Sequence, residues 1–190
     1  MKFVLIGLIS FWGFCTNPTE PTIKEVNIKE SNVNWTGRKV LGSHTGNISI
    51  KSGALEFEND QLVGGEFMID MRTITVTDLS GDKAKNLTGH LSSPDFFNIA
   101  EFPTSNFKIT KVTSRGSAGD YKITGDLTIK GITNSITFNA MLMKENMASA
   151  TTQVDRSLYD IKYGSGSFFD GLGDKTIYDE FEITVNLVMK

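Results

Sequence analysis

Hydrophobic and polar residues alternate along much of this chain. From Tyr121 to Lys130 every second residue is apolar or glycine, and the residues between them are Lys, Thr or Asp. The segment 181–189 begins with the same pattern, in which Glu, Thr and Asn separate the apolar residues. Successive side chains of a strand point to opposite faces of a sheet. Each segment is therefore expected to form a long strand with one buried face and one solvent-facing side.

Shorter alternating runs fill most of the chain from Val26 onward. Turn-forming residues separate these runs, which predicts eight or nine antiparallel strands joined by short connections. Gly64–Gly65 within one run predicts a β-bulge or a close approach of the backbone. The pattern is typical of up-and-down barrels and of sandwiches, and alternation alone does not distinguish the two. The shorter runs are Val33–Trp35, Ile48–Ile50, Leu55–Phe57, Phe67–Met71, Phe107–Ile109, Ile136–Leu142, Thr152–Val154 and Tyr159–Tyr163.

One segment, residues 80–98, departs from the two-residue period. Apolar residues between Ala84 and Leu91 recur at helical spacing after residues that favour a helix start. Ser93 followed by Pro94 is typical of an N-cap and a first helical residue, so a further short turn is expected there. That turn would place Phe96–Phe97 against the barrel. We therefore expect one helical insertion, packed over the barrel or across its mouth.

The start of the chain is similar to an export signal. Lys2 precedes an apolar run that ends at Cys15 and is too short for the about 20 residues of a membrane-spanning helix. A lone cysteine at this place is typical of bacterial lipoproteins, in which it becomes the lipid-modified first residue. Phe14 departs from that motif, because a small residue usually precedes the cysteine, so secretion without lipid and a retained anchor are the alternatives. The expected organisation is a signal peptide at 1–14, a lipid-anchored flexible tether at 15–25 and one barrel domain at 26–190.

Composition narrows the function further. The net charge of −3 argues against nucleic-acid binding, which usually requires a basic surface. The two histidines, His44 and His90, and the single cysteine form no spacing typical of a metal site. Gly164–Ser167 is out of register for a nucleophile elbow. We expect both histidines to make structural hydrogen bonds, and no catalysis, metal or cofactor.

Several motifs follow one another along roughly residues 28–189. The first are Val33-x-Trp35-x-Gly37, His44-x-Gly46 and Gly53-x-Leu55. The next are Phe67–Met71, Leu87-x-Gly89-His90-Leu91-x-Ser93-x-Asp95-Phe96-Phe97, Phe102-Pro103-x-x-x-Phe107 and Gly125–Gly131. Together these motifs resemble the YceI-like, polyisoprenoid-binding family. Asp155–Arg156 and Tyr163–Phe169 are similar to the secreted or lipid-anchored bacterial members of that family.

The resemblance implies an all-β fold, an antiparallel eight-stranded lipocalin-like barrel with one helical insertion. It also implies a periplasmic or envelope location and a long apolar tunnel that holds an isoprenoid or similar amphiphilic lipid without enzymatic activity. Homodimers occur in this fold, and membrane attachment would come through the lipid on Cys15. The residues that we expect to line the interior and bind the ligand are Trp35, Phe67, Ile69, His90, Phe96, Phe97, Ile123, Leu127, Phe138, Phe168, Phe181, Ile183 and Val185.

Arg156 is the polar residue with two competing interpretations. The first is a structural salt bridge with Asp70, Asp155 or Asp160. In the second, Arg156 or Lys130 meets an anionic head group where the tunnel opens.

Three functions follow from these observations. The first is a carrier that encloses an apolar chain, which requires an interior that its own side chains do not fill. The second is an enzyme that acts on an apolar substrate at the barrel mouth, with His44 or His90 as general base. The third is a filled barrel that presents segments 80–98 and 164–173 to a partner protein. Exposed rings at Phe168–Phe169 would favour the third.

Overall fold

A computed structural model describes residues 20–144 and 146–190 of the chain. The expected signal peptide at 1–14, Cys15 and residues 16–19 of the expected tether lie outside the described residues. The described part contains nine strands, one α-helix and two short 3-10 helices. The strands are β1 (Thr22–Glu25), β2 (Asn32–Lys39), β3 (Gly42–Glu58), β4 (Gln61–Val76), β5 (Thr104–Ser114), β6 (Asp120–Ile129), β7 (Ile132–Met143), β8 (Met147–Asp155) and β9 (Ile177–Val188). The helices are α1 (Gly81–Ser92), η1 (Arg156–Tyr159) and η2 (Gly173–Lys175).

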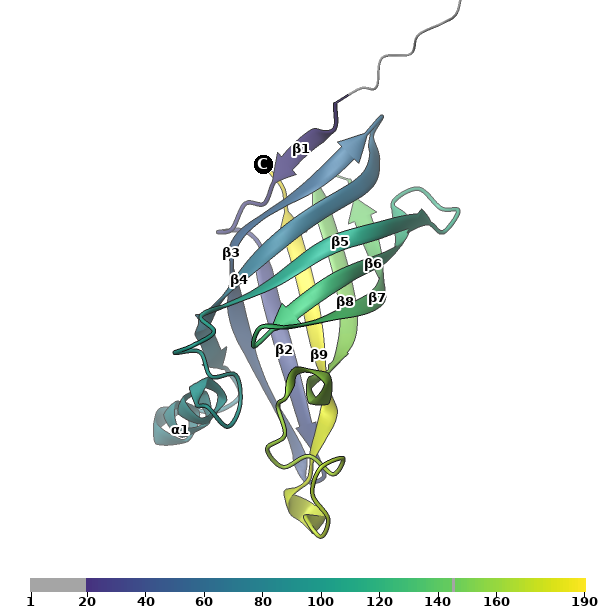
Figure 1. The fold of residues 1–190 in the computed structure, drawn as a ribbon. Coiled ribbons are helices and arrows are strands. Elements are labelled where there is room, and N and C mark those ends of the chain that lie inside the picture. The colour runs from purple at the N-terminus through teal and green to yellow at the C-terminus, as the bar shows by residue number, and fades with distance from the viewer. Residues whose placement is uncertain (1–19, 145) are drawn as a thin grey trace, which may run out of the picture.

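Strands β2 to β9 form a closed antiparallel barrel of eight strands (Figure 1). They follow the order β3-β2-β9-β8-β7-β6-β5-β4, and the pairing of β4 with β3 closes the ring. The short strand β1 pairs with Ala54–Phe57 of β3 as a ninth strand. The predicted eight-stranded barrel with one helical insertion is therefore confirmed, and the sandwich alternative is wrong.

The two ends of the elongated barrel differ (Figure 1). At the terminal end, β1 lies beside the C-terminus, where the Lys190 N–H donates to the Glu25 carbonyl at 2.8 Å. At the opposite end, which we call the loop end, the connection between β8 and β9 carries η1 and η2, and α1 lies to one side (Figure 1). The predicted bulge also occurs: Glu56 pairs with Gly64 and Phe57 with Leu62, so Val63 is the extra residue.

The helical insertion differs in detail from the prediction. Helix α1 ends at Ser92, and Ser93 follows its last turn instead of starting a second helix. The backbone N–H and the side-chain hydroxyl of Ser93 both donate to the His90 carbonyl, at 3.1 and 2.8 Å. These bonds satisfy a carbonyl that the end of a helix leaves free. The following turn buries Phe96 and Phe97, each 8% exposed, as the sequence predicts.

The expected strand at Tyr159–Tyr163 is wrong. Its first part belongs to η1, and Asp160 adopts a left-handed conformation with φ of 57°. The Asp155 side chain accepts the Ser157 N–H at 2.8 Å, which favours a helical start over an extended chain. The alternation of apolar residues here reflects individual buried positions, because Tyr159 and Ile161 are both 0% exposed.

Candidate functional site

The barrel encloses an apolar cavity of about 260 Å³. Its wall includes residues from Tyr121 to Ile129 on β6 and from Leu62 to Ile74 on β4. Eight to twelve residues at about 3.4 Å each, tilted by about 40° in the barrel, give a length of about 20–30 Å. The cavity is therefore an elongated tunnel with an apolar wall.

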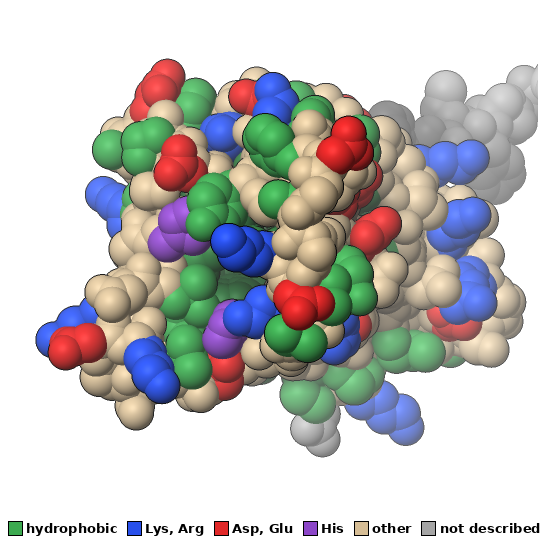
Figure 2. Space-filling view, turned by 90° about the horizontal axis from the view of Figure 1, so that it is seen from below, with side chains coloured by type: hydrophobic (Ala, Val, Ile, Leu, Met, Phe, Trp, Pro, Cys, Tyr) green, Lys and Arg blue, Asp and Glu red, His purple; other side chains and the backbone are tan. Residues whose placement is uncertain are grey.

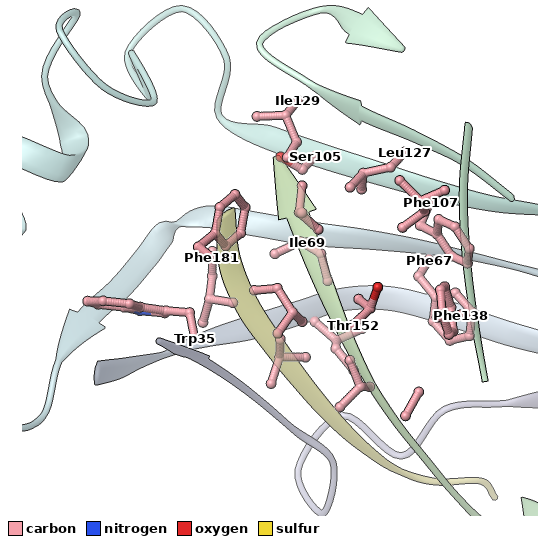
Figure 3. A pocket seen from close by; sticks show the side chains of 18 of the residues that line it. Trp35, Phe67, Ile69, Ser105, Phe107, Leu127, Ile129, Phe138, Thr152 and Phe181 are labelled. Carbon is pink, nitrogen blue, oxygen red and sulfur yellow. The ribbon is translucent and has the colours of Figure 1, made fainter. Parts of the chain in front are cut away.

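Two groups of aromatic rings line the tunnel, one on each side of Ile69 (Figure 3). Phe107 lies between Phe67 and Phe138, with ring centroids 6.5 and 5.5 Å from theirs. Figure 3 places these three rings together and shows Trp35 and Phe181 on the other side of Ile69. The Trp35 indole N–H donates to the Thr75 carbonyl at 3.2 Å, which satisfies its one polar group inside an otherwise apolar wall.

Two glycines allow rings to lie close against the barrel backbone. A Cβ atom on Gly125 would lie 2.4 Å from the Phe107 ring, and one on Gly46 would lie 2.5 Å from the Trp35 ring. The Gly46 Cβ would also lie 1.8 Å from the Thr75 carbonyl oxygen. No side chain fits at either position without a shift of its neighbours. These glycines therefore help to set the positions of rings in the wall of the tunnel.

Most of the predicted ligand-binding residues lie in the tunnel wall. Phe168 does not line it and is 44% exposed, because it lies in the connection between β8 and β9 and not on a strand of the barrel. His90 is also outside the wall, since its ring packs against Phe96 and Tyr163 with centroids 5.7 and 4.3 Å apart. The eleven that do line the tunnel are Trp35, Phe67, Ile69, Phe96, Phe97, Ile123, Leu127, Phe138, Phe181, Ile183 and Val185.

Sequence reasoning missed other residues of the wall. Phe107, Ile129 and Ile136 lie at inward positions of strands that were recognised, so the same alternation could have found them. Thr152 shares a face with Val154 in the expected run Thr152–Val154, whereas Ser105 had no such signal, because a hydroxyl on a strand usually faces water. The Ser105 hydroxyl donates to the Met71 sulfur at 3.1 Å, which explains how it is buried at 6% exposure.

The loop end presents a hollow with hydrophobic side chains on its floor (Figure 2). Histidine, Lys or Arg and acidic side chains surround it in the same view. Tyr178 lines the tunnel and is also 48% exposed, which places it where the tunnel meets the surface. Phe169 and Leu158, 50% and 55% exposed, belong to the connection between β8 and β9 at this end, Leu158 within η1. The tunnel therefore has an amphipathic mouth at the loop end.

Arg156 lies in the tunnel wall near Tyr178 and is only 2% exposed. Its Nε, Nη1 and Nη2 donate to the carbonyls of Tyr178, Ile161 and Ile177 at 3.1, 2.8 and 3.0 Å. Its ion-pair partner is Asp179, with Nη2 and Oδ1 3.3 Å apart. The partners that we expected from the sequence, Asp70 and Asp160, instead contact Arg72 and Lys162.

Burial and nearby carboxylates shift the pKa of Arg156 in opposite directions. Burial lowers the pKa of the guanidinium, while Asp179 and Asp155 oppose that shift. The Phe96 ring lies 5.6 Å from the guanidinium carbon and adds a cation–π contact. Lys130, the other candidate for a head group, is not in the wall; its ammonium donates to the Asp160 carbonyl at 3.0 Å.

His44 and His90 both lie outside the tunnel wall. His44 Nδ1 lies 2.8 Å from Asp78 Oδ2, and Asp78 Oδ1 accepts the Thr45 N–H at 2.9 Å. Partial burial acts to raise the pKa of Asp78, but the Thr45 N–H and His44 outweigh it, so the pKa is lowered. His90 Nε2 is buried without a hydrogen-bond partner among the described residues. The expected structural hydrogen bond therefore exists at His44, and His90 is held by aromatic packing.

Within residues 20–144 and 146–190, no three His, Cys, Asp or Glu side chains lie close enough together to hold a metal ion. No helix in that part is long and apolar enough to cross a membrane.

The sequence matches known proteins along most of its length. Residues 25–189 match the model of the YceI-like domain. A UPF0312 protein of Shewanella denitrificans is 33% identical over 49% of this chain and 46% of its own length. Protein YceI of Escherichia coli is 32% identical over 48% of this chain and 44% of its own length. The chain thus spans about half the length of the curated relatives that it matches first.

Solved structures show the same fold at low sequence identity. Burkholderia cenocepacia BcnA is 19% identical with a TM-score of 0.67, over 85% of this chain and 98% of that one. A polyisoprenoid binding domain from Saccharophagus degradans is 10% identical with a TM-score of 0.61, over 86% of this chain and 95% of that one.

Proposed function

The chain belongs to the YceI-like family, and we propose that it binds one isoprenoid or similar long apolar chain inside its barrel. The elongated apolar tunnel is the observation that carries this proposal, because its shape matches a single extended chain and few other ligands. A neighbour in fold is a polyisoprenoid binding domain, which supports the choice of ligand class. The length of the tunnel, about 20–30 Å, accommodates about four to six isoprene units of about 5 Å each.

Burial of the chain supplies enough free energy without a strong polar anchor. Each isoprene unit has five carbons and gains up to about 4 kcal/mol on burial, at about 0.8 kcal/mol per carbon group. Association costs on the order of 4–15 kcal/mol. A few units therefore suffice for useful affinity, and the length and width of the tunnel select the ligand.

The protein acts in this proposal as a carrier in the bacterial envelope. The apolar segment before Cys15 supports export, and a lipid on Cys15 would attach the chain to a membrane. The barrel shields a water-insoluble chain and needs no reaction. We assign no catalytic role to His44 or His90, which lie outside the tunnel wall.

Native mass spectrometry of protein purified without detergent from an envelope fraction tests this function. We expect a discrete hydrophobic adduct, whose mass after organic extraction identifies the ligand class. A clean ligand-free mass, together with no uptake of added prenyl lipids, would contradict the proposal. The same spectra separate monomer from dimer and so test the expected homodimer.

The exposed rings of Phe168–Phe169 favour a second role, contact with a partner protein at the loop end. The two rings are 44% and 50% exposed, and Lys162 Nζ lies 5.3 Å from the Phe168 ring centroid. The barrel's own side chains leave a cavity of about 260 Å³, which argues against the filled barrel that we first considered for this role. Replacement of both rings by Ser, followed by crosslinking in envelope fractions, tests it, and an unchanged crosslinking pattern would exclude it.

A further inference from the structure

The tip of the hairpin between β2 and β3 carries apolar side chains where a turn usually carries polar ones. Val40 and Leu41 form this tip and are 44% and 66% exposed. Turns favour Gly, Pro, Asn, Asp and Ser, and a large apolar side chain gains nothing from contact with water. Nothing within the folded barrel therefore accounts for a leucine at this place, and an apolar environment outside the barrel would.

Hydrogen bonds join this tip to the loop end and to the tunnel wall. The Val40 N–H donates to the Thr176 carbonyl at 3.2 Å. The next residue, Ile177, donates its N–H to the Gly164 carbonyl at 2.8 Å. Ile177 also pairs with Lys39 on β2 and lines the tunnel. The hairpin tip, the connection between β8 and β9 and the mouth of the tunnel therefore meet at one place.

Aromatic side chains surround the same opening. Tyr163 and Tyr178 are each 48% exposed, and Phe168–Phe169 follow in the same connection. The Ser167 hydroxyl donates to Asp179 Oδ2 at 2.6 Å, which holds the two Phe residues beside the start of β9. Figure 2 shows hydrophobic side chains in and around the hollow at this end. Exposed Tyr and Phe around an apolar tip are typical of surfaces that enter the membrane interface.

The charge of this surface is nearly balanced. Segments 38–41 and 156–179, which form it, carry five basic and four acidic side chains. Electrostatic attraction to anionic lipids is therefore weak, because such attraction requires a cluster of basic residues. Attachment to a bilayer would depend on the apolar area that enters it.

The proposed ligand favours a bilayer over a protein as the occupant of this surface. A long isoprenoid chain dissolves in lipid and is strongly disfavoured in water. It must therefore pass between a bilayer and the tunnel. A mouth that lies against the bilayer allows this passage without exposing the chain to water.

We propose that the loop end docks onto a lipid bilayer, with Leu41 and the surrounding rings in the interfacial region, and that the ligand passes directly between bilayer and tunnel. The passage of the ligand rests on the proposed function, whereas docking itself requires no bound ligand. β1 and the C-terminus lie at the opposite end of the barrel, so they leave this face free (Figure 1).

Quenching by brominated lipid tests which end of the full chain meets the bilayer. The apolar run before Cys15 is also expected to attract lipid, so the readout has to be specific for position. Leu41→Trp places an indole at the hairpin tip. Ile23→Trp is the matched control, because Ile23 is 63% exposed and lies on β1 at the terminal end.

The vesicles are phosphatidylcholine with bromine on the acyl chains. We expect the vesicles to quench Leu41→Trp more strongly than Ile23→Trp, since an interfacial side chain lies within about 5–10 Å of the acyl chains. The difference should persist at high salt, because the surface is nearly neutral.

A second variant, Leu41→Asn, tests whether docking serves transfer. Asn is favoured in turns, so the hairpin should fold as before. We expect transfer of a fluorescent isoprenoid alcohol from phosphatidylcholine vesicles to be about 10-fold slower, the effect of one lost leucine contact with lipid. Equilibrium affinity for the same alcohol should not change, because Leu41 is not in the tunnel wall. Ile23→Asn should alter neither quantity.

The outcomes distinguish this inference from the function on which it rests. Equal quenching of the two Trp variants would overturn docking, leave the tunnel intact and assign the exposed rings to a partner protein. Selective quenching with unchanged transfer in Leu41→Asn would overturn the transfer step alone. No binding of the alcohol to the unaltered protein would overturn the proposed function, and selective quenching would then still establish docking.

Discussion

Ala150 offers a direct way to block the tunnel. It pairs with Ala140 on β7 and Val185 on β9, and all three residues line the cavity. Ala150→Trp would place an indole ring in the tunnel. Thr151→Trp is the matched control, because Thr151 is exposed and points to the outer face of the same strand.

The size of the effect follows from the length of chain that is excluded. Ala150 lies six residues from Arg156 along the chain, so a block there leaves about 15 Å of tunnel toward the loop end, which is about three isoprene units. Burial of one unit gains up to about 4 kcal/mol. Even a quarter of that gain, about 1 kcal/mol, changes the dissociation constant by about fivefold. The unaltered protein should therefore gain at least about fivefold in affinity per added unit, until the tunnel is full.

Titration with isoprenoid alcohols of increasing length measures this dependence. We expect the affinity of Ala150→Trp to stop rising after about three units, and that of Thr151→Trp to follow the unaltered protein. The indole should also fit into existing space, so the free energy of unfolding should not show the about 1–3 kcal/mol loss of an overpacked core. An identical length dependence in Ala150→Trp and the unaltered protein would refute the tunnel.

Two further substitutions test contacts of the barrel wall. Hydrogen bonds from Thr45 and His44 lower the pKa of Asp78. The ionised carboxylate therefore stabilises the fold fully at a pH above the ordinary carboxyl pKa. This stabilisation is lost as the pH falls through the lowered pKa of the folded protein. Asp78→Asn should therefore cost about 1 kcal/mol in urea unfolding near neutral pH and almost nothing in strong acid; an equal loss at both would contradict the pKa assignment. Gly46→Ala should cost about 3 kcal/mol, because its Cβ meets backbone at 1.8 Å, whereas Gly37→Ala, with nothing within 4 Å, should cost much less.

The sequence was informative wherever one face of a strand is buried. In 121–130 and 181–189, alternation alone predicted which residues point inward, since a strand has only two faces. It could not predict closure, because the pairing of β2 with β9 joins strands far apart in the sequence and depends on the register and tilt of all the other strands. Nor could it predict an empty interior, which depends on how far side chains from opposite walls reach toward each other.

Loop residues were predicted least well. Alternation at Tyr159–Tyr163 predicted a strand, but the Asp155 cap and the carbonyls gathered around Arg156 fix a helical turn. The ion pair of Arg156 with Asp179 joins two ends of a long connection, and no local pattern specifies it. Phe168 was expected inside because it is aromatic, yet its position depends on the path of the same connection.

The tunnel itself is an energetic argument for a ligand. An empty space of about 260 Å³ corresponds to about 6 kcal/mol of lost stability, at about 24 cal/mol per Å³ of cavity. That loss is comparable with the entire stability of many domains, on the order of 5–15 kcal/mol. Substitutions as simple as larger residues at Ala148 and Ala150 would fill part of the space. A chain that instead keeps small residues there gains nothing from the cavity unless a ligand occupies it, and a ligand that binds only the folded barrel stabilises it in proportion to the logarithm of its concentration.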